Sequence, residues 1–240
     1  MTRGWSRLRR HHLARASLIF LIAIMVLSLA APLIAELRGV DPTQTDLFHR
    51  FEPPSAAYWL GTDDVGRDLF QRLLDGGRVS LLVGLAGALL SGLLGALIGV
   101  LRTVPNKALA GIATAYVELF RNVPLLVQLF IWYFVLPELL PASIGNAYKQ
   151  SNPVLQQFLA SMVCLGLFTS ARVAEQVRAG INSLPRGQKN AGLALGFTLP
   201  QTYRFVMLPM AFRLVVPPLT SEFLNIFKNS AVCSTIGLLE

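Results

Sequence analysis

The chain has 240 residues, of which 53% are hydrophobic and only 14% are charged. Soluble domains carry about 25% charged residues, so this composition argues against a soluble domain and for a bundle of membrane helices. The formal net charge of +8 comes from basic residues that flank apolar runs, which favours membrane orientation over nucleic-acid binding. The two cysteines, Cys164 and Cys233, form no CxxC motif and no cluster with histidine, so neither a metal site nor a disulfide framework is predicted.

The first apolar run covers residues 17–35 and follows five arginines in the first 15 residues. A basic segment before an apolar run is also typical of a cleaved signal peptide. This run is long, however, and no clean small-residue cleavage site ends it. We therefore expect a signal anchor whose N-terminus lies in the cytoplasm, because basic flanks remain on that side.

Residues 36–78 are polar and carry five arginines against eight acidic residues. Their prolines and glycines indicate loops and turns, and the acidic balance is typical of the outer side of a membrane. Asp63, Asp64 and Asp68 resemble paired carboxylates for acid–base catalysis, but no catalytic constellation accompanies them and a structural turn is favoured. Residues 1–78 are thus expected to form a tail, an anchor helix and an outer loop.

The second span is predicted over residues 79–101, where small residues recur at a spacing of four. Such rows let a neighbouring helix approach closely within lipid. We expect ordinary helix packing along both rows. One row is Gly84, Ala88, Gly92 and Ala96, and the other is Gly87, Ser91, Gly95 and Gly99.

Three further spans are predicted over residues 123–140, 154–171 and 207–227. A short segment, 108–122, precedes the first of them, and residues 138–153 are expected to be an outer loop. The last span contains Pro217 and Pro218. A proline pair breaks the helical hydrogen-bond ladder, which is tolerated where protein or a cavity surrounds the break.

The stretch 172–205 carries five basic residues against the single acid Glu175. This excess places it in the cytoplasm, and the charge asymmetry then agrees at every turn of a five-span chain. We therefore predict an all-α membrane protein, a polytopic helical bundle of about five transmembrane helices, with its core over residues 79–240.

Small residues dominate the middle of this cytoplasmic stretch. Ala191, Gly192 and Ala194 would let a short helix sit in a cleft on a partner. Gly196 would end that helix in the left-handed conformation, and Pro209 would help the chain to re-enter the membrane. These features fit a rigid lever, and they also fit an amphipathic connector that lies on lipid.

The same stretch resembles the EAA loop of binding-protein-dependent ABC permeases, whose pattern is E-A-A, three residues, G, nine residues and I-x-L-P. The matching positions are Asn190-Ala191-Gly192, Gly196 and Val206-Met207-Leu208-Pro209. Asn190 stands in place of the family's acid and Gly192 in place of its second alanine. The resemblance implies that the loop contacts an ATPase through Arg186, Gly187, Gln188, Lys189, Asn190, Ala191, Gly192, Leu195, Gly196, Leu208 and Pro209.

Different parts of the chain resemble two different permease families. Residues from about 97 to 240 resemble polar amino-acid permeases, in particular the glutamate/aspartate members, through 101–106, 116–125, 183–191 and 216–222. Residues 1–96 are similar to di- and oligopeptide permeases, through 60–68 and 76–81. Amino-acid permeases of this type continue into one more span, so the resemblance predicts a hybrid-like chain truncated at its C-terminus.

These resemblances imply the permease subunit of a type I ABC importer for polar amino acids, in particular glutamate and aspartate, in the bacterial inner membrane. The expected partners are an ABC ATPase dimer, a second permease chain that is identical or paired, an external substrate-binding protein and the lipid bilayer. The chain itself would be no enzyme and would bind no cofactor, since ATP and Mg would bind the ATPase. A di- or oligopeptide permease and a non-transporting scaffold or inactive hybrid are the alternatives.

Ionisable groups inside a membrane are costly and usually face a cavity or a partner. Arg213 could neutralise a substrate carboxylate or reach toward the inner surface, and Glu222 could hold the substrate ammonium or lie at the outer surface. Glu118 and Arg121 share one helix face, as a surface pair or as part of a site. A polar stretch after the last span could line the pathway or form a solvated helix end, and it comprises Lys228, Asn229 and Ser230.

Overall fold

The computed structural model describes residues 11–41 and 44–238. These residues form two compact units, and the boundary between Leu82 and Val83 falls inside helix α4 (Leu69–Leu101). Throughout the described part the regular structure is helical, apart from one isolated antiparallel bridge between Thr62 and Asp68. The predicted all-α fold is confirmed.

The first unit begins with α2 (His12–Leu29) and α3 (Ala31–Arg38). The run predicted as one anchor helix is therefore two helices, separated at Ala30. Pro32 stands in the first turn of α3, and because it has no N–H it cannot continue the hydrogen-bond ladder of α2. Residues 1–10 of the predicted cytoplasmic tail lie outside the described residues, and residues 12–16 of that tail belong to α2.

The loop of the first unit between α3 and α4, predicted to be an outer loop, is held by close backbone approaches and one buried ion pair. A Cβ atom on Gly66 would lie 1.8 Å from the carbonyl oxygen of Asp46, so only glycine fits. Arg38 is paired with the fully buried carboxylate of Asp68 at 2.7 Å. The loop also contains a 3-10 turn (Leu47–His49) and it ends where α4 begins. Residues 69–78, predicted as part of the loop, are helical.

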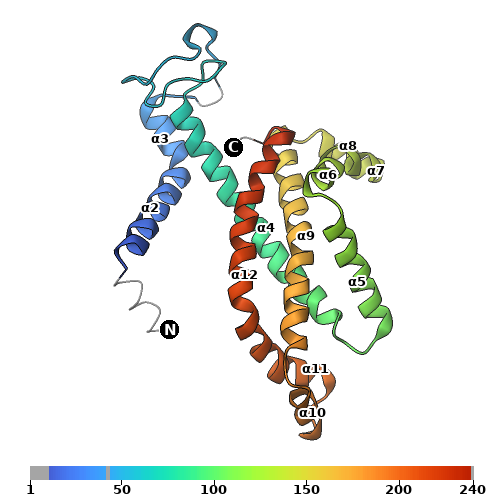
Figure 1. Ribbon diagram of the computed structural model, residues 1–240. Coiled ribbons are helices and arrows are strands. Elements are labelled where there is room, and N and C mark those ends of the chain that lie inside the picture. Colours follow the sequence, from blue (N-terminus) through green and yellow to red (C-terminus); the bar gives the residue numbers. More distant parts are fainter. Residues whose placement is uncertain (1–10, 42–43, 239–240) are drawn as a thin grey trace. The chain divides into compact units, whose positions relative to one another are not determined.

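The second unit contains the rest of α4 and the helices that follow it. These are α5 (Lys107–Asn122), α6 (Leu125–Phe130), a π-helical turn (Ile131–Val135), α7 (Leu136–Leu139), α8 (Ala142–Lys149), α9 (Pro153–Asn182), α10 (Arg186–Ala194), α11 (Leu199–Thr202), a second π-helical turn (Tyr203–Met207), α12 (Leu208–Ser230) and a 3-10 turn (Ala231–Ile236). The long helix α9 lies between α5 and α12 (Figure 1). Helix α8 occupies part of the predicted outer loop 138–153.

Small residues on α4 allow this helix to pack closely on α9. A Cβ on Gly95 would lie 2.6 Å from Cβ of Val173, and one on Gly99 would lie 2.7 Å from the carbonyl oxygen of Ala174. Nothing lies within 4 Å of the same atom at Gly92. The predicted close packing is therefore present at these two positions of the second row. It is also present at Gly84 of the first row, where a Cβ would lie 2.5 Å from Cε1 of Phe227 in α12, but it is absent at Gly92.

Three described helices, α2, α4 and α9, are long and apolar enough to cross a membrane. A fourth span arises if α5 and the segment Leu125–Leu139 count together, although they are bent by 103°. Helix α12 has 23 residues, which gives a length of about 35 Å at 1.5 Å per residue. It is long enough to cross a membrane but less apolar than α2, α4 and α9, and it is not among the candidate spans of the described chain.

The expectation that Pro217 and Pro218 interrupt the last span is wrong, because α12 runs through both prolines. A proline inside a helix removes one backbone N–H donor, and the helix is retained because α12 packs along α9. Its interior residues Ala211 and Val215 are buried there in a cluster with Val177 of α9.

Candidate functional site

Helix α10, where the coupling loop is predicted, ends in a Schellman motif. The carbonyl oxygen of Gly192 accepts a 3.2 Å hydrogen bond from the N–H of Phe197, and that of Leu193 accepts a 3.0 Å bond from Gly196. Gly196 has φ +84°, the left-handed conformation in which glycine carries no Cβ penalty. The predicted role of Gly196 in ending the helix is confirmed.

One face of α10 is a strip of small exposed side chains. Gly187, Ala191 and Ala194 are exposed, and their spacing of four and three places them on one side of the helix. No atom lies within 4 Å of a Cβ placed on Gly187. Leu195, 76% exposed, continues this strip. The strip could accept the surface of another protein at close range.

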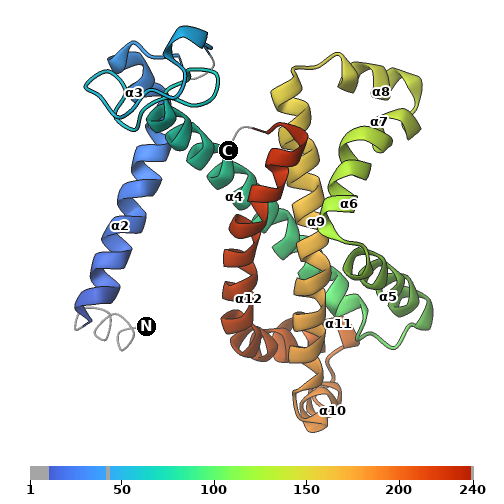
Figure 2. The same ribbon diagram turned by 45° about the horizontal axis from the view of Figure 1, so that its top comes forward.

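The opposite side of α10 is packed against the chain that follows it. A Cβ on Gly192 would lie 2.7 Å from Cγ2 of buried Thr202, so the lack of a side chain allows α10 to contact α11. The first turn of α11 is fixed by Gln201, whose side-chain oxygen accepts a 2.8 Å hydrogen bond from the backbone N–H of Thr198. Figure 2 shows α10 and α11 at one end of α9 and α12.

Tyr203 connects this region to the segment that follows α4. Its side chain is buried, and its hydroxyl donates a 2.8 Å hydrogen bond to the carbonyl oxygen of Thr103. It also belongs to a buried cluster with Val173 and Ile181 of α9 and Met207. Displacement of α10 would therefore act on several long helices together.

The other predicted coupling residues fall on different sides of the region. Those that are half-buried are Gln188, Lys189 and Leu208, and those that are exposed are Asn190 and Pro209. The side chain of Arg186 lies outside the described residues.

A second candidate site is a polar depression of about 430 Å³ between α5, α9 and α12. Its lining consists of Arg121, Arg172, Glu175, Gln176 and Glu222. Charged side chains on helices that cross a membrane face protein or a water-filled cavity. The cluster is therefore the strongest candidate for a polar pathway in the described part of the chain.

Glu175 joins three helices through arginine side chains. Its carboxylate pairs with Arg102 at the end of α4, with Arg178 at 3.0 Å, and with Arg121 of α5 at 3.4 Å. The side chain of Arg102 is only 7% exposed. Because three guanidinium groups pair with Glu175, its carboxylate has a structural role in connecting these helices.

Glu222 and Gln176 retain hydrogen-bonding capacity. One carboxylate oxygen of Glu222 accepts a 3.1 Å hydrogen bond from the amide of Gln176. The other carboxylate oxygen and the Gln176 amide oxygen are buried and have no partner among the described residues. Arg172 stacks its guanidinium 4.8 Å from the centre of the Phe168 ring and has no carboxylate partner in the described chain. The depression thus offers acceptors and a cation to a ligand.

Several predicted pathway residues lie outside this depression. Arg213, Glu118 and Lys228 are exposed, and Asn229 is half-buried. Ser230 is buried, and its hydroxyl donates to the carbonyl oxygen of Phe227 at 2.8 Å.

The sequence suggested that Arg121 pairs with Glu118 on one helix face. In the structure its partner is Glu175. Arg172, Glu175 and Gln176 were missed as site residues. Their spacing of three and four on one helix was the available signal.

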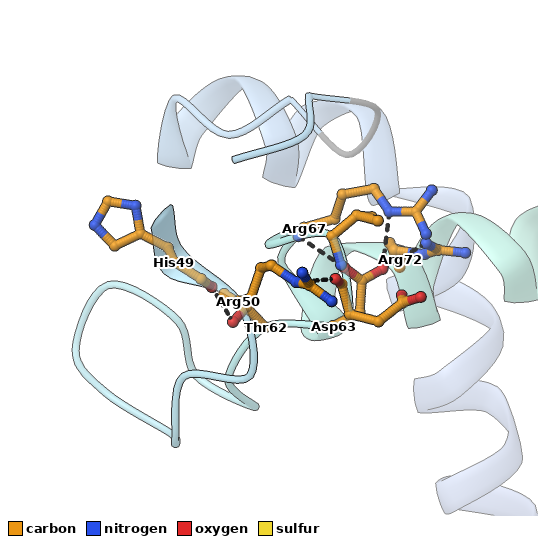
Figure 3. Close-up of polar contacts among 8 residues, drawn as sticks. His49, Arg50, Thr62, Asp63, Arg67 and Arg72 are labelled. Atoms are coloured by element: carbon orange, nitrogen blue, oxygen red, sulfur yellow. Dashed lines mark hydrogen bonds and ion pairs between the residues drawn. The ribbon is translucent and has the colours of Figure 1, made fainter. Parts of the chain in front are cut away.

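The acidic turn of the outer loop is structural, as predicted. Asp63 accepts hydrogen bonds from the backbone N–H groups of Val65 and Arg67 and from the guanidinium groups of Arg67 and Arg72 (Figure 3). Partial burial alone would raise the pKa of Asp63. The backbone N–H groups and the Arg67 guanidinium outweigh that effect and lower the pKa to about 2.

A second contact of an acidic residue in this loop lies at the protein surface. His49 lies 2.6 Å from Asp46, and this hydrogen bond raises the pKa of the His49 ring above its usual value.

No group of three or more potential metal ligands occurs among the described residues.

Two family models match this chain. The model described as "Binding-protein-dependent transport system inner membrane component" matches residues 91–239, which is more than half of the chain. The model described as the N-terminal TM domain of oligopeptide transport permease C matches residues 1–54. The predicted resemblance of one chain to two kinds of permease is therefore confirmed.

Individual relatives agree with the longer match. The chain is 66% identical over 143 residues to the glutamate/aspartate import permease protein GltJ of Escherichia coli K12, covering 59% of this chain and 58% of that protein. It is 38% identical to a Bacillus subtilis protein named "Probable glutamine ABC transporter permease protein GlnM", covering 72% and 74%. A crystal structure of an amino acid ABC transporter with histidines is similar with a TM-score of 0.55 and 31% identity, over 67% of this chain and 70% of that one.

Proposed function

This chain belongs to the family of binding-protein-dependent transport system inner membrane components, and from that premise we propose that it is the permease subunit of an ABC importer for polar amino acids. It is a multi-pass membrane protein. We assign it to the bacterial inner membrane with a cytoplasmic N-terminus. ATP and Mg bind a separate ATPase subunit, and this chain carries no cofactor and catalyses no hydrolysis.

The observation that carries the proposal is the construction of α10. Its exposed strip of small residues can lie in a cleft of an ATPase subunit, while Gly192 on its other side packs on Thr202, whose neighbour Tyr203 is hydrogen-bonded to Thr103. A short helix held by the ATPase on one side and by α11 on the other would move as one body. Closure of the ATPase dimer would therefore change the arrangement of α9 and α12 and switch the access of the pathway.

The polar depression supports an acidic amino acid as the substrate. A zwitterion with a second carboxylate needs cations and acceptors for its ammonium group. Arg172 supplies one cation, and Arg121 would supply the second by sharing its guanidinium between Glu175 and the substrate. The buried oxygens of Glu222 and Gln176 that have no partner among the described residues supply those acceptors. A volume of about 430 Å³ lies within the range of small-molecule sites.

A second permease chain, identical or paired, would cover α12. Arg213 and Lys228 are exposed on this helix, and charged residues in a membrane do not remain against lipid tails. The pathway would then run between two chains, and an external binding protein would deliver the substrate.

The peptide-permease alternative rests on the match to residues 1–54. None of the residues of the polar depression lies in that part of the chain. The non-transporting scaffold is distinguished only by a transport measurement.

Uptake into proteoliposomes tests both alternatives. The chain, its ATPase, its partner permease and its binding protein are reconstituted, and labelled glutamate, a labelled dipeptide and labelled lysine are compared. We expect ATP-dependent uptake of glutamate alone and its loss in Glu222→Gln, whereas Glu118→Gln, at an exposed position outside the depression, retains it. Dipeptide uptake or the absence of all uptake would contradict the proposal.

A further inference from the structure

A groove of about 490 Å³ lies beside α10, at the ends of α9 and of the segment that follows α4. Its polar lining includes Asn182, Lys189 and Asn190, and its apolar lining includes Ile181, Leu184 and Met207. The groove lies apart from the polar depression, because the two share no lining residue.

Lys189 does not belong to the exposed strip of α10. Successive residues of a helix are rotated by about 100°, so Lys189 lies about 200° round the helix from Gly187. Its side chain is half-buried and lines the groove, whereas Gly187 and Ala191 are exposed. A partner that docks on the strip would therefore leave the ammonium group of Lys189 in the groove.

The donors of the groove have no internal acceptor. Among the described residues, Lys189, Asn182 and Asn190 make no side-chain hydrogen bond or ion pair. The two hydroxyl groups beside them are already used, since Thr103 donates to the carbonyl oxygen of Val100 at 2.8 Å and Tyr203 donates to that of Thr103. One ammonium group and two carboxamides therefore face the groove with their donors unused.

The charge of the surroundings selects an anion. The stretch 172–205 contains one acidic residue, Glu175, against five basic residues, and Glu175 is already paired with three arginines. No carboxylate lines the groove. An ammonium group with neighbouring amide donors is a suitable environment for a phosphate oxygen.

We propose that the groove binds the phosphate of an anionic membrane phospholipid, held by Lys189 and by the amides of Asn182 and Asn190. Helices α4 and α9 are both candidate spans, and the groove lies where they end. That is the level of lipid headgroups, where basic pockets between membrane helices bind anionic lipids. Ile181, Leu184 and Met207 would contact the glycerol and the first methylene groups. This site would anchor the base of α10 whether or not the chain transports amino acids.

Lipid retention by the purified full chain tests the site. The protein is held in nanodiscs of phosphatidylcholine with phosphatidylglycerol, transferred to detergent, and examined by native mass spectrometry. We expect one retained phosphatidylglycerol in preference to phosphatidylcholine. Loss of one charge-assisted hydrogen bond corresponds to about a tenfold weaker interaction, so Lys189→Gln should lose retention by about tenfold. Arg204→Gln, on the same basic stretch but outside the groove, should retain the lipid.

Three outcomes would overturn the proposal, provided that melting curves show both variants to be folded. The first is equal loss of lipid in Lys189→Gln and Arg204→Gln, which would indicate general charge attraction. The second is binding of inorganic phosphate at constant ionic strength without retention of phosphatidylglycerol, which would assign the groove to a free anion. The third is release of the lipid when the ATPase subunit binds, which would assign the groove to a protein side chain.

Discussion

The hydroxyl of Tyr203 donates a 2.8 Å hydrogen bond to the carbonyl oxygen of Thr103, which lies 100 residues earlier in the chain. Tyr203 begins the π-helical turn before α12, and Thr103 follows the end of α4. This bond connects the coupling region to the segment after α4, which is distant from it in the sequence. In the proposed mechanism it transmits the displacement of α10.

Tyr203→Phe should weaken this connection. Loss of the hydroxyl removes one hydrogen bond, which is worth about 1 kcal/mol of unfolding free energy, or roughly 2–4 °C in Tm for a chain of this size. Thermal unfolding in detergent measures the change. Tyr133→Phe is the matched control, because the Tyr133 hydroxyl makes no hydrogen bond in the described chain. Equal melting of wild type and Tyr203→Phe would show that the bond is absent in solution.

Gly95→Ala should destabilise the second unit. The added methyl group would lie 2.6 Å from Cβ of Val173 and 2.7 Å from the carbonyl oxygen of Ser170, and such overpacking costs about 1–3 kcal/mol. Gly92→Ala is the control on the same helix, where nothing lies within 4 Å and the gain in helix propensity is up to about 1 kcal/mol. Thermal unfolding of the two variants should shift in opposite directions, and a lower Tm for Gly92→Ala alone would contradict the packing described.

Glu175→Gln should cost more than the removal of an ordinary surface charge. The substitution leaves the nearly buried Arg102 without its carboxylate. Breaking a buried pair costs about 3–5 kcal/mol, and we expect about 2 kcal/mol because Glu175 itself is 34% exposed. Chemical unfolding in mixed micelles measures the loss. Glu118→Gln, at an exposed position, should be neutral, and similar stabilities of the two variants would refute the bridging role of Glu175.

The loop between α3 and α4 should open at low pH through protonation of Asp63. The folded-state pKa of about 2 is lower than the ordinary value of 3.8, so the stabilisation is complete above pH 3.8 and is lost as pH falls through about 2. At 1.36 kcal/mol per pKa unit this amounts to about 2 kcal/mol. Pepsin cleavage of the loop between pH 4 and 2, normalised to an unstructured peptide, measures the opening. In Asp63→Asn cleavage should be high throughout, and a pH-independent wild-type rate would exclude this carboxylate as the cause.

His49 should titrate above its ordinary value of 6.5 because the Asp46 carboxylate stabilises the protonated ring. The substitution Asp46→Asn removes that partner, so the titration midpoint of the His49 ring should fall toward 6.5. The pH dependence of His49 modification by diethyl pyrocarbonate, read by peptide mass spectrometry, gives both midpoints. Glu52→Gln is a weaker perturbation, since its carboxylate lies 3.9 Å away, and should shift the midpoint less.

Local patterns predicted those features that depend on nearby residues. Apolar length and flanking charge identified α4 and α9, and the spacing of small residues identified the close approach at Gly95. The left-handed conformation of Gly196 followed from its place at the end of a short helix.

Features that depend on tertiary contacts could not be predicted in the same way. The continuation of α12 through Pro217 is decided by its packing on α9. Glu222 comes close to Gln176 only after α9 and α12 have packed. The sequence alone therefore does not distinguish Glu222, which lines the depression, from an exposed charged residue such as Arg213.

The proposed coupling depends on the exposed strip of α10. Its most direct test is the ATPase rate of the reconstituted complex with and without substrate-loaded binding protein, measured for Ala191→Trp and for Ala115→Trp. Ala191 lies on the strip, whereas Ala115 is an exposed alanine of α5 outside both candidate sites. We expect the binding protein to stimulate hydrolysis in wild type and Ala115→Trp but not in Ala191→Trp, although all three chains insert and fold. Full stimulation in Ala191→Trp would contradict the proposed coupling.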